Sequence, residues 1–296
     1  MKLLTFKEQQ NGQEMVGVLA KDQTKVISVK SLGISYDTMN DLIEKITPTE
    51  FEMLKSAADR DDAQAFPLEH LVKMAPIPNP KQDIICLGIN YMAHAEESAR
   101  FKKEAFGGER PKAIYFSKRV DEAVADGGGI PSHEDMVNSL DYEAELGVII
   151  KKDAKNVAKE DAYDYVFGYT ILNDVSARNV QTEHTQWYFG KSLDGFAPMG
   201  PWIVTADEFD APPVLDIKCR VNGELRQDSS TSLLIFNIAH VISELSQGMT
   251  LKAGTVISMG TPAGVGMGFV PPKFLKRGDI VECEIERIGR LKNMIV

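Results

Sequence analysis

The chain has 296 residues, of which 43% are hydrophobic and 26% charged, a composition that excludes a disordered chain, a coiled coil or a small disulfide scaffold. Its formal net charge is -10, and its lysines and arginines are dispersed rather than gathered on a stripe, so we expect no nucleic-acid partner. Three widely spaced cysteines indicate neither a thiolate metal site nor disulfides, and no apolar run is long enough for a signal peptide or membrane span, so we expect a cytoplasmic protein without a membrane partner.

The first 75 residues contain the pattern of a small β/α unit. Three short apolar runs at 2–6, 14–20 and 25–29 are separated by polar turns, which predicts a β-meander. Helical spacing follows at 35–46. A second helix is predicted from Thr47, a suitable N-cap, with Pro48 as the first helical residue and Glu50 completing a capping box.

Residues 75–82 (APIPNPKQ) contain three prolines, which restrict the chain to extended geometry. We therefore predict a small N-terminal domain over 1–75 and a larger domain over 76–296. After a helical stretch at 93–105, the larger domain consists mostly of strand-like runs without regular βαβ alternation, which predicts a β-rich α+β fold. These runs lie at 113–116, 144–150, 165–172, 201–206, 216–223, 254–259 and 279–289.

The run 139–150, SLDYEAELGVII, has three acids at alternate positions. If it is one strand, Asp141, Glu143 and Glu145 share one face, where like charges repel. One interpretation is an edge strand whose acidic face lies in water. The other is a divalent cation, because Asp174 ends a second apolar run and would join Glu143 and Glu145 if the strands are neighbours. Such an all-oxygen site selects Mg²⁺, Mn²⁺ or Ca²⁺.

Other residues have both a structural and a chemical interpretation. His94 and Glu97 would be neighbours on one helix face, either as a surface pair or as a general base with its orienting carboxylate. Lys191 is either a surface lysine or a cation for a developing negative charge, and Lys118 is either part of an exposed basic pair or a contact to an anionic substrate. Thr261 lies in a glycine-rich turn that lacks dinucleotide-loop spacing.

Six motifs occur in an order and spacing that resemble the fumarylacetoacetate hydrolase superfamily, in its shorter bacterial and mitochondrial members. They are GINYMAHAEE, DYEAELGVII, NDVSARNVQ, GKSLDGFAPMGPW, VNGELRQ and GTPAGVG, and the resemblance covers about residues 76–296. It implies a mixed β-sheet roll with a small N-terminal domain, a homodimer, and a small anionic 2-oxo acid or acylpyruvate as substrate. The implied cofactor is Mg²⁺ or Mn²⁺, with Ca²⁺ as a further option.

The resemblance also implies residue roles. The metal ligands are Glu143, Glu145 and Asp174, and His94 with Glu97 activates a water molecule. Lys191 stabilises an enolate beside the metal. The substrate-binding positions are Arg178, Gln181, Thr261 and Lys118. Residues 101–110 correspond to a segment that can close over the substrate, with Gly107 and Gly108 as a joint.

The implied reaction is hydrolysis of a C–C bond through a metal-bound enolate. The alternatives are an oxaloacetate decarboxylase or a 2-oxo acid isomerase or hydratase on the same site, and, less favoured, a non-catalytic metabolite-binding protein. Two departures from the family pattern are the missing match for a fourth carboxylate ligand and Asn179, where an aspartate is common.

Overall fold

The structure is a computed structural model that describes residues 1–59, 65–108 and 112–296. Its described strands form two main sheets. The larger is a mixed sheet of eleven strands in the order β4-β3-β2-β1-β13-β11-β10-β16-β6-β7, with β5 paired to β1. Its strands are β1 (Lys2–Lys7), β2 (Met15–Leu19), β3 (Lys25–Ser28), β4 (Phe66–Pro67), β5 (Val72–Lys73), β6 (Ile84–Gly88), β7 (Ile114–Lys118), β10 (Ala144–Ile150), β11 (Val166–Asn173), β13 (Met199–Thr205) and β16 (Val256–Ser258).

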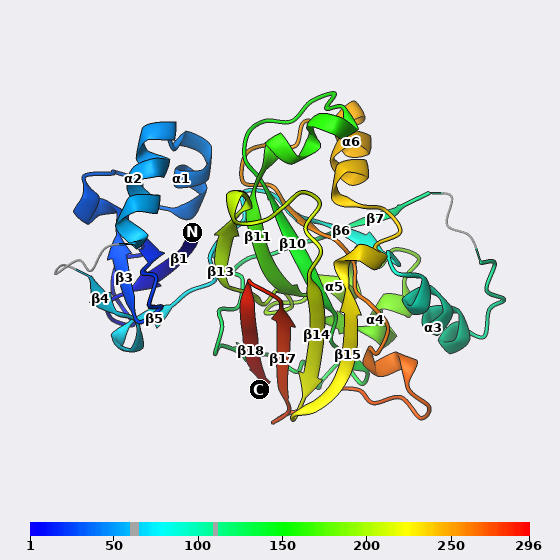
Figure 1. Cartoon of the computed structure of the whole chain (residues 1–296). Coiled ribbons are helices and arrows are strands. Elements are labelled where there is room, and N and C mark those ends of the chain that lie inside the picture. The colour runs from blue at the N-terminus through cyan, green and yellow to red at the C-terminus, as the bar shows by residue number, and fades with distance from the viewer. Residues whose placement is uncertain (60–64, 109–111) are drawn as a thin grey trace.

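The second sheet has five strands and packs across the first (Figure 1). Its strands are β8 (Gly129–Ile130), β14 (Asp216–Val221), β15 (Glu224–Ser230), β17 (Ile280–Ile285) and β18 (Gly289–Ile295), and a separate pair is formed by β9 (Leu140–Asp141) and β12 (Ser176–Ala177). The helices are α1 (Met39–Lys45), α2 (Pro48–Ala58), α3 (Met92–Lys102), α4 (Arg178–Glu183), α5 (Tyr188–Lys191) and α6 (Ile238–Gly248). The predicted β-rich α+β fold is confirmed.

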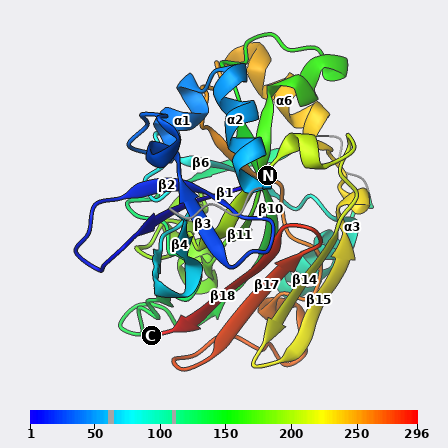
Figure 2. The same cartoon turned by 60° about the vertical axis from the view of Figure 1, so that its left-hand side comes forward.

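The N-terminal elements form as their sequence predicts. Strands β1, β2 and β3 make an antiparallel meander, and α1 and α2 lie beside it in the blue part of Figure 2. Helix α2 begins at Pro48 after Thr47, and the capping box with Glu50 is present in full. The meander is also joined to the larger sheet, because β1 pairs with β13 through Leu3 and Ile203. The division at residues 75 and 76 stays a prediction, and this pairing crosses it.

Strand β10 lies in the middle of the larger sheet, between β11 and β16, and all its residues are buried. Leu146 and Val148 pack into a core shared with Ile217 and Cys283 of the second sheet. The acidic side chain of Glu145 therefore points to the opposite face, since side chains alternate along a strand.

The run 139–150 is not one continuous strand, and the strand-like run predicted at 144–150 forms β10 with the same bounds. Strand β9 ends at Asp141 and β10 begins at Ala144. Between them the N–H of Tyr142 donates to Oδ1 of Asp141 at 2.9 Å, and the N–H of Glu143 donates to Oδ1 of Asn173 at 3.0 Å. Side-chain oxygens thus accept the N–H groups that a neighbouring strand would otherwise bind, and this break in the strand determines where the side chain of Glu143 points.

The described residues contain no helix that combines the length and apolarity needed to cross a membrane.

Candidate active site

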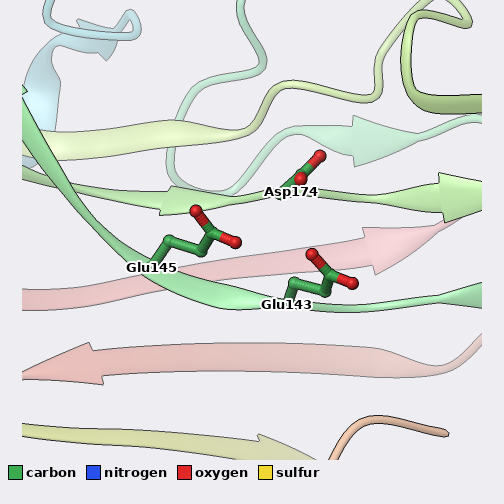
Figure 3. Close-up of side chains that lie close together, drawn as sticks. All are labelled: Glu143, Glu145 and Asp174. Atoms are coloured by element: carbon green, nitrogen blue, oxygen red, sulfur yellow. The ribbon is translucent and has the colours of Figure 1, made fainter. Parts of the chain in front are cut away.

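Three carboxylates meet where β10 and β11 come together. Glu145 lies on β10, Glu143 just before it, and Asp174 just after β11, whose last residue pairs with Ala144. One oxygen of each carboxylate lies within 4.8 Å of the others, and all three residues are buried. Figure 3 shows the three carboxylates gathered in one place. The predicted proximity is confirmed, and the edge-strand interpretation is wrong because β10 has a partner on both sides.

The cluster fits a divalent cation by its donor set and its electrostatics. The donors are all carboxylate oxygens, which hard cations prefer. Burial raises the pKa of Glu145 well above its ordinary range, and the charges of Asp174 and Glu143 raise it further. Oε2 of Glu145 is fixed by the Ser258 hydroxyl at 2.5 Å and the Gly260 N–H at 2.8 Å. A positive charge is therefore needed to hold three ionised carboxylates here.

Lys191 supplies one such charge from the end of α5. Its Nζ lies 2.8 Å from Oε2 of Glu143 and 2.6 Å from Oδ2 of Asp174. Burial alone would lower the pKa of Lys191, but Asp174 and Glu143 outweigh it and raise that pKa above its ordinary value. The surface interpretation of Lys191 is wrong, since its side chain is 2% exposed.

Arg178, the first residue of α4, links two carboxylates. Its Nε lies 2.9 Å from Oδ2 of Asp141, its Nη2 lies 2.7 Å from Oε1 of Glu143, and its Nη1 donates to Oε1 of Gln181 at 3.1 Å. Burial would raise the pKa of Glu143, but Lys191 and Arg178 hold that pKa well below its usual range. Asp141, the first acid of the run, is thus part of the support for the cluster.

Lys118 is buried at the end of β7, so the exposed-pair interpretation is wrong. Its Nζ donates to the carbonyls of Val175 at 3.0 Å, Phe196 at 2.8 Å and Lys191, and lies 2.8 Å from Oδ1 of Asp174. These contacts hold Asp174 in place, and burial lowers the pKa of Lys118. Its proposed contact to substrate stays a prediction.

A cavity of about 490 Å³ opens onto the cluster. Glu143, Glu145 and Lys191 line it, and so do three of the four predicted substrate-binding residues, Arg178, Gln181 and Thr261. Lys118, the fourth, is not among the lining residues. Apolar walls come from Phe116, Trp187 and Met267, and further polar groups from Ser98, Lys102, Thr182 and His184. The sequence did not predict these wall residues, because their spacing along the chain follows no recognisable pattern. The cavity therefore places acidic, cationic and apolar side chains around one space beside the cluster.

His94 on α3 also lines the cavity. Its Nδ1 lies 3.3 Å from Oε2 of Glu97, and both side chains are buried, so the surface-pair interpretation is wrong. An ionised carboxylate only accepts hydrogen bonds, so this contact places the proton on Nδ1 and leaves Nε2 able to accept one. The second Glu97 oxygen, Oε1, accepts the N–H of Gly264 at 2.9 Å.

Thr261 lies in the loop after β16 and lines the cavity. Its hydroxyl donates to the carbonyl of Ala144 at 2.9 Å and accepts from Nε2 of Gln227 at 2.8 Å. Oε1 of Gln227 in turn accepts the N–H of Ala144 at 3.0 Å. Gln227 lies in the motif VNGELRQ, but nothing in the sequence alone showed that it reaches the start of β10.

The segment 101–110 was predicted to close over the substrate. Its residues 109 and 110 lie outside the described residues, so this closure stays a prediction.

Comparison with known proteins decides the family. The sequence model of the Fumarylacetoacetate (FAA) hydrolase C-terminal family matches residues 83–296. The chain belongs to the fumarylacetoacetate hydrolase family. Its sequence is 46% identical over 244 residues to the oxaloacetate tautomerase YisK of Bacillus subtilis (strain 168), a match that covers 82% of this chain and 79% of that protein.

Two solved structures of this family resemble the whole chain. The fumarylacetoacetate hydrolase of the psychrophile Exiguobacterium antarcticum has a TM-score of 0.83 and 39% identity, covering 100% of this chain and 99% of that one. The 5-carboxymethyl-2-hydroxymuconate delta-isomerase of Mycobacterium smegmatis has a TM-score of 0.72 and 28% identity, with coverage of 100% and 99%. Proteins of the family that resemble this chain therefore include a tautomerase, a hydrolase and an isomerase by name.

Proposed function

We propose that this protein is a metal-dependent tautomerase that interconverts the keto and enol forms of oxaloacetate or a similar short 2-oxo dicarboxylate. The observation that carries this proposal is that His94 lines one cavity together with Glu143 and Glu145, two of the three clustered carboxylates. The similarity to an oxaloacetate tautomerase over most of both chains supports the choice of reaction. The hydrolase expected first from the sequence becomes the second candidate.

Glu143, Glu145 and Asp174 would hold the cation, for which we propose Mg²⁺ or Mn²⁺, with Ca²⁺ as a further option. When bound, such a cation supplies Lewis-acid polarisation of the 2-oxo group and offsets the charge of the substrate carboxylate. Arg178, Gln181 and Thr261 line the same cavity and would bind the carboxylate end of the substrate. The apolar walls would exclude water from the reacting carbon.

The proton transfer falls to His94. In the keto-to-enol direction, Nε2 of His94 accepts a proton from C3 of the substrate, and the C3–H electron pair becomes the C2–C3 double bond. The C2–O π pair moves onto the 2-oxo oxygen, which takes up a proton from water, and the His94 imidazolium returns its proton to water. Glu97 keeps Nδ1 protonated and stabilises the imidazolium that forms. Lys191 lies beside the cluster and stabilises the negative charge that develops on the 2-oxo oxygen. The enol-to-keto direction reverses these steps.

A C–C hydrolase is the second candidate, favoured by the full-length similarity to the Exiguobacterium antarcticum fumarylacetoacetate hydrolase. In that reaction Nε2 of His94 would take a proton from water instead of carbon. The same residues serve both reactions, so the choice depends on the substrate that the cavity walls accept.

The test is an assay with purified protein and Mg²⁺ or Mn²⁺. Three rates are compared. They are the loss of the enol absorbance of oxaloacetate, the cleavage of acetylpyruvate and fumarylpyruvate, and the release of pyruvate from oxaloacetate. The proposal expects tautomerisation to be the fastest, to stop on chelation and to return with metal. Faster cleavage of an acylpyruvate would make the protein a hydrolase, and faster pyruvate release a decarboxylase.

We also propose a homodimer, as the resemblance implies, and light scattering of the purified chain tests it. A monomer at micromolar concentration would contradict that part of the proposal.

A further inference from the structure

The run Gly264–Gly268 (GVGMG), which is not a dinucleotide loop, lies directly against the catalytic helix α3. The N–H of Gly264 donates to Oε1 of Glu97 at 2.9 Å. A Cβ added at Gly268 would lie 1.9 Å from that same oxygen and 2.5 Å from Cγ of Glu97. The side chain of Glu97 thus occupies the space that any side chain at position 268 would need.

Backbone conformation does not explain the glycine at 268. Gly264 has a φ of +102°, which favours glycine, and its added Cβ would lie 1.8 Å from the carbonyl oxygen of Arg226. Gly268 has no such positive φ, and the three atoms nearest to its added Cβ all belong to Glu97. A glycine at 268 is therefore required by Glu97 and not by the turn.

The same loop also holds the support of the carboxylate cluster. The N–H groups of Gly266 and Met267 donate to Asp141 at 2.6 and 3.0 Å. Asp141 is paired with Arg178, whose guanidinium contacts Glu143. One five-residue loop thus fixes the carboxylate that orients His94 and, separately, the network that fixes a residue of the cluster.

We propose that Gly264–Gly268 is the positioning element that sets His94 relative to the carboxylate cluster, and that Gly268 is a positioning residue acting through Glu97. This rests on the proposed function only in giving His94 the proton transfer. The side-chain-free surface of Gly268 lets Glu97 lie between the loop and His94, so the imidazole is held in one orientation without any contact between Gly268 and the substrate.

The kinetic test is a double-mutant cycle of Gly268→Ala and Glu97→Ala, with turnover and Mn²⁺ affinity measured for each protein. We expect Gly268→Ala to lower kcat on the order of 10²-fold, the cost of misplacing a catalytic group by about 1 Å, with KM and Mn²⁺ affinity little changed. In the Glu97→Ala background, Gly268→Ala should lower kcat no further. An equal loss in both backgrounds would overturn the proposal.

The second arm does not depend on turnover. Urea unfolding of the same four proteins should show that Gly268→Ala destabilises the parent chain but not the Glu97→Ala chain, in which the obstructing carboxylate has been removed. Gly248→Ala is the matched control, because Gly248 ends α6 with no atom within 4 Å of an added Cβ and no positive φ.

These arms separate the two proposals. If oxaloacetate is not tautomerised but the unfolding cycle is coupled, the positioning inference stands and the proposed function fails. If Gly268→Ala does not fold alone but folds together with Glu97→Ala, the inference is supported. If neither the Gly268→Ala variant nor the double variant folds, the inference is overturned. It is also overturned if Gly268→Ala costs the same stability in the parent and in the Glu97→Ala background.

Discussion

The ammonium group of Lys191 lies 2.6 Å from Oδ2 of Asp174, within a cluster of three buried carboxylates. Nζ is also 2.8 Å from Oε2 of Glu143, so two carboxylates of this cluster share one positive charge from a side chain of the protein itself. The pKa of Glu145, the third member, is raised by burial and by its two acidic neighbours. The site is thus built around a positive charge, which leads to the following predictions.

Replacing Lys191 with methionine should destabilise the metal-free protein by about 3–5 kcal/mol, the usual cost of leaving buried partners unpaired. Addition of Mn²⁺ should recover stability in the variant by more than it does in the parent protein, because the cation then replaces the charge that Lys191 supplies to Glu143 and Asp174. Urea unfolding with and without Mn²⁺ measures both effects.

The matched control is Lys252→Met, which removes an ion pair of the same length, 2.6 Å to Asp153, from an exposed position. That change should cost far less stability than Lys191→Met, because an exposed ion pair is screened by water. Equal losses for the two methionine variants would show that the Lys191 contacts contribute nothing to stability.

Glu145→Gln should remove the stabilisation that Mn²⁺ gives to the parent protein, which is about 2.7 kcal/mol at a metal concentration of about 100 times Kd. Without metal the variant should be at least as stable as the parent, because the amide removes a charge that repels Asp174 and Glu143. Thermal unfolding across a Mn²⁺ titration checks this, with the exposed Glu160→Gln as control. An unchanged metal response in Glu145→Gln would remove Glu145 from the ligand set.

His94→Ala should lower kcat by about 10²- to 10⁴-fold, the usual contribution of a positioned general base. The Mn²⁺-dependent rise in unfolding temperature should be kept, since His94 is not one of the three clustered carboxylates. Glu97→Gln should reduce kcat less, because the imidazole remains but loses its charged partner at Nδ1. Unchanged turnover in His94→Ala would exclude His94 as the general base, whereas a parent protein that turns over none of the 2-oxo acids would favour a non-catalytic metabolite-binding protein.

Lys118→Met should act mainly on stability, because Lys118 donates to three backbone carbonyls from a buried position. We expect a loss of about 3–5 kcal/mol in the free energy of unfolding, from the unpaired Asp174 and the unsatisfied carbonyls. Its exposed neighbour Arg119, changed to methionine, should stay within about 0.5 kcal/mol. A stable Lys118→Met protein with a raised KM would instead assign Lys118 to substrate binding.

Local signals in the sequence predicted local structure well. Thr47, Pro48 and Glu50 specify the start of α2, and the apolar runs predicted the main strands because burial follows side-chain spacing. From the residues alone, the carboxylate cluster depended on the two strands being neighbours, and the resemblance to the family supplied the full set. The structure pairs the two strands, β10 and β11.

Features that depend on distant parts of the chain were not predicted. The break between β9 and β10 depends on Asn173, which accepts the N–H of Glu143. The burial of Lys118 depends on backbone carbonyls from other segments. The pairing of β1 with β13 connects the two domains that the sequence predicted. The reason for Gly268 is likewise a side chain on α3. Such contacts leave no periodicity in their own segment, so only the folded structure shows them.

The most direct measurement is the anomalous difference density of a crystal of this protein soaked in Mn²⁺. We expect one strong peak between Glu143, Glu145 and Asp174, with Nζ of Lys191 moved away from at least one of its two carboxylates. Density that shows no metal at saturating Mn²⁺, with Lys191 still between Glu143 and Asp174, would contradict this expectation.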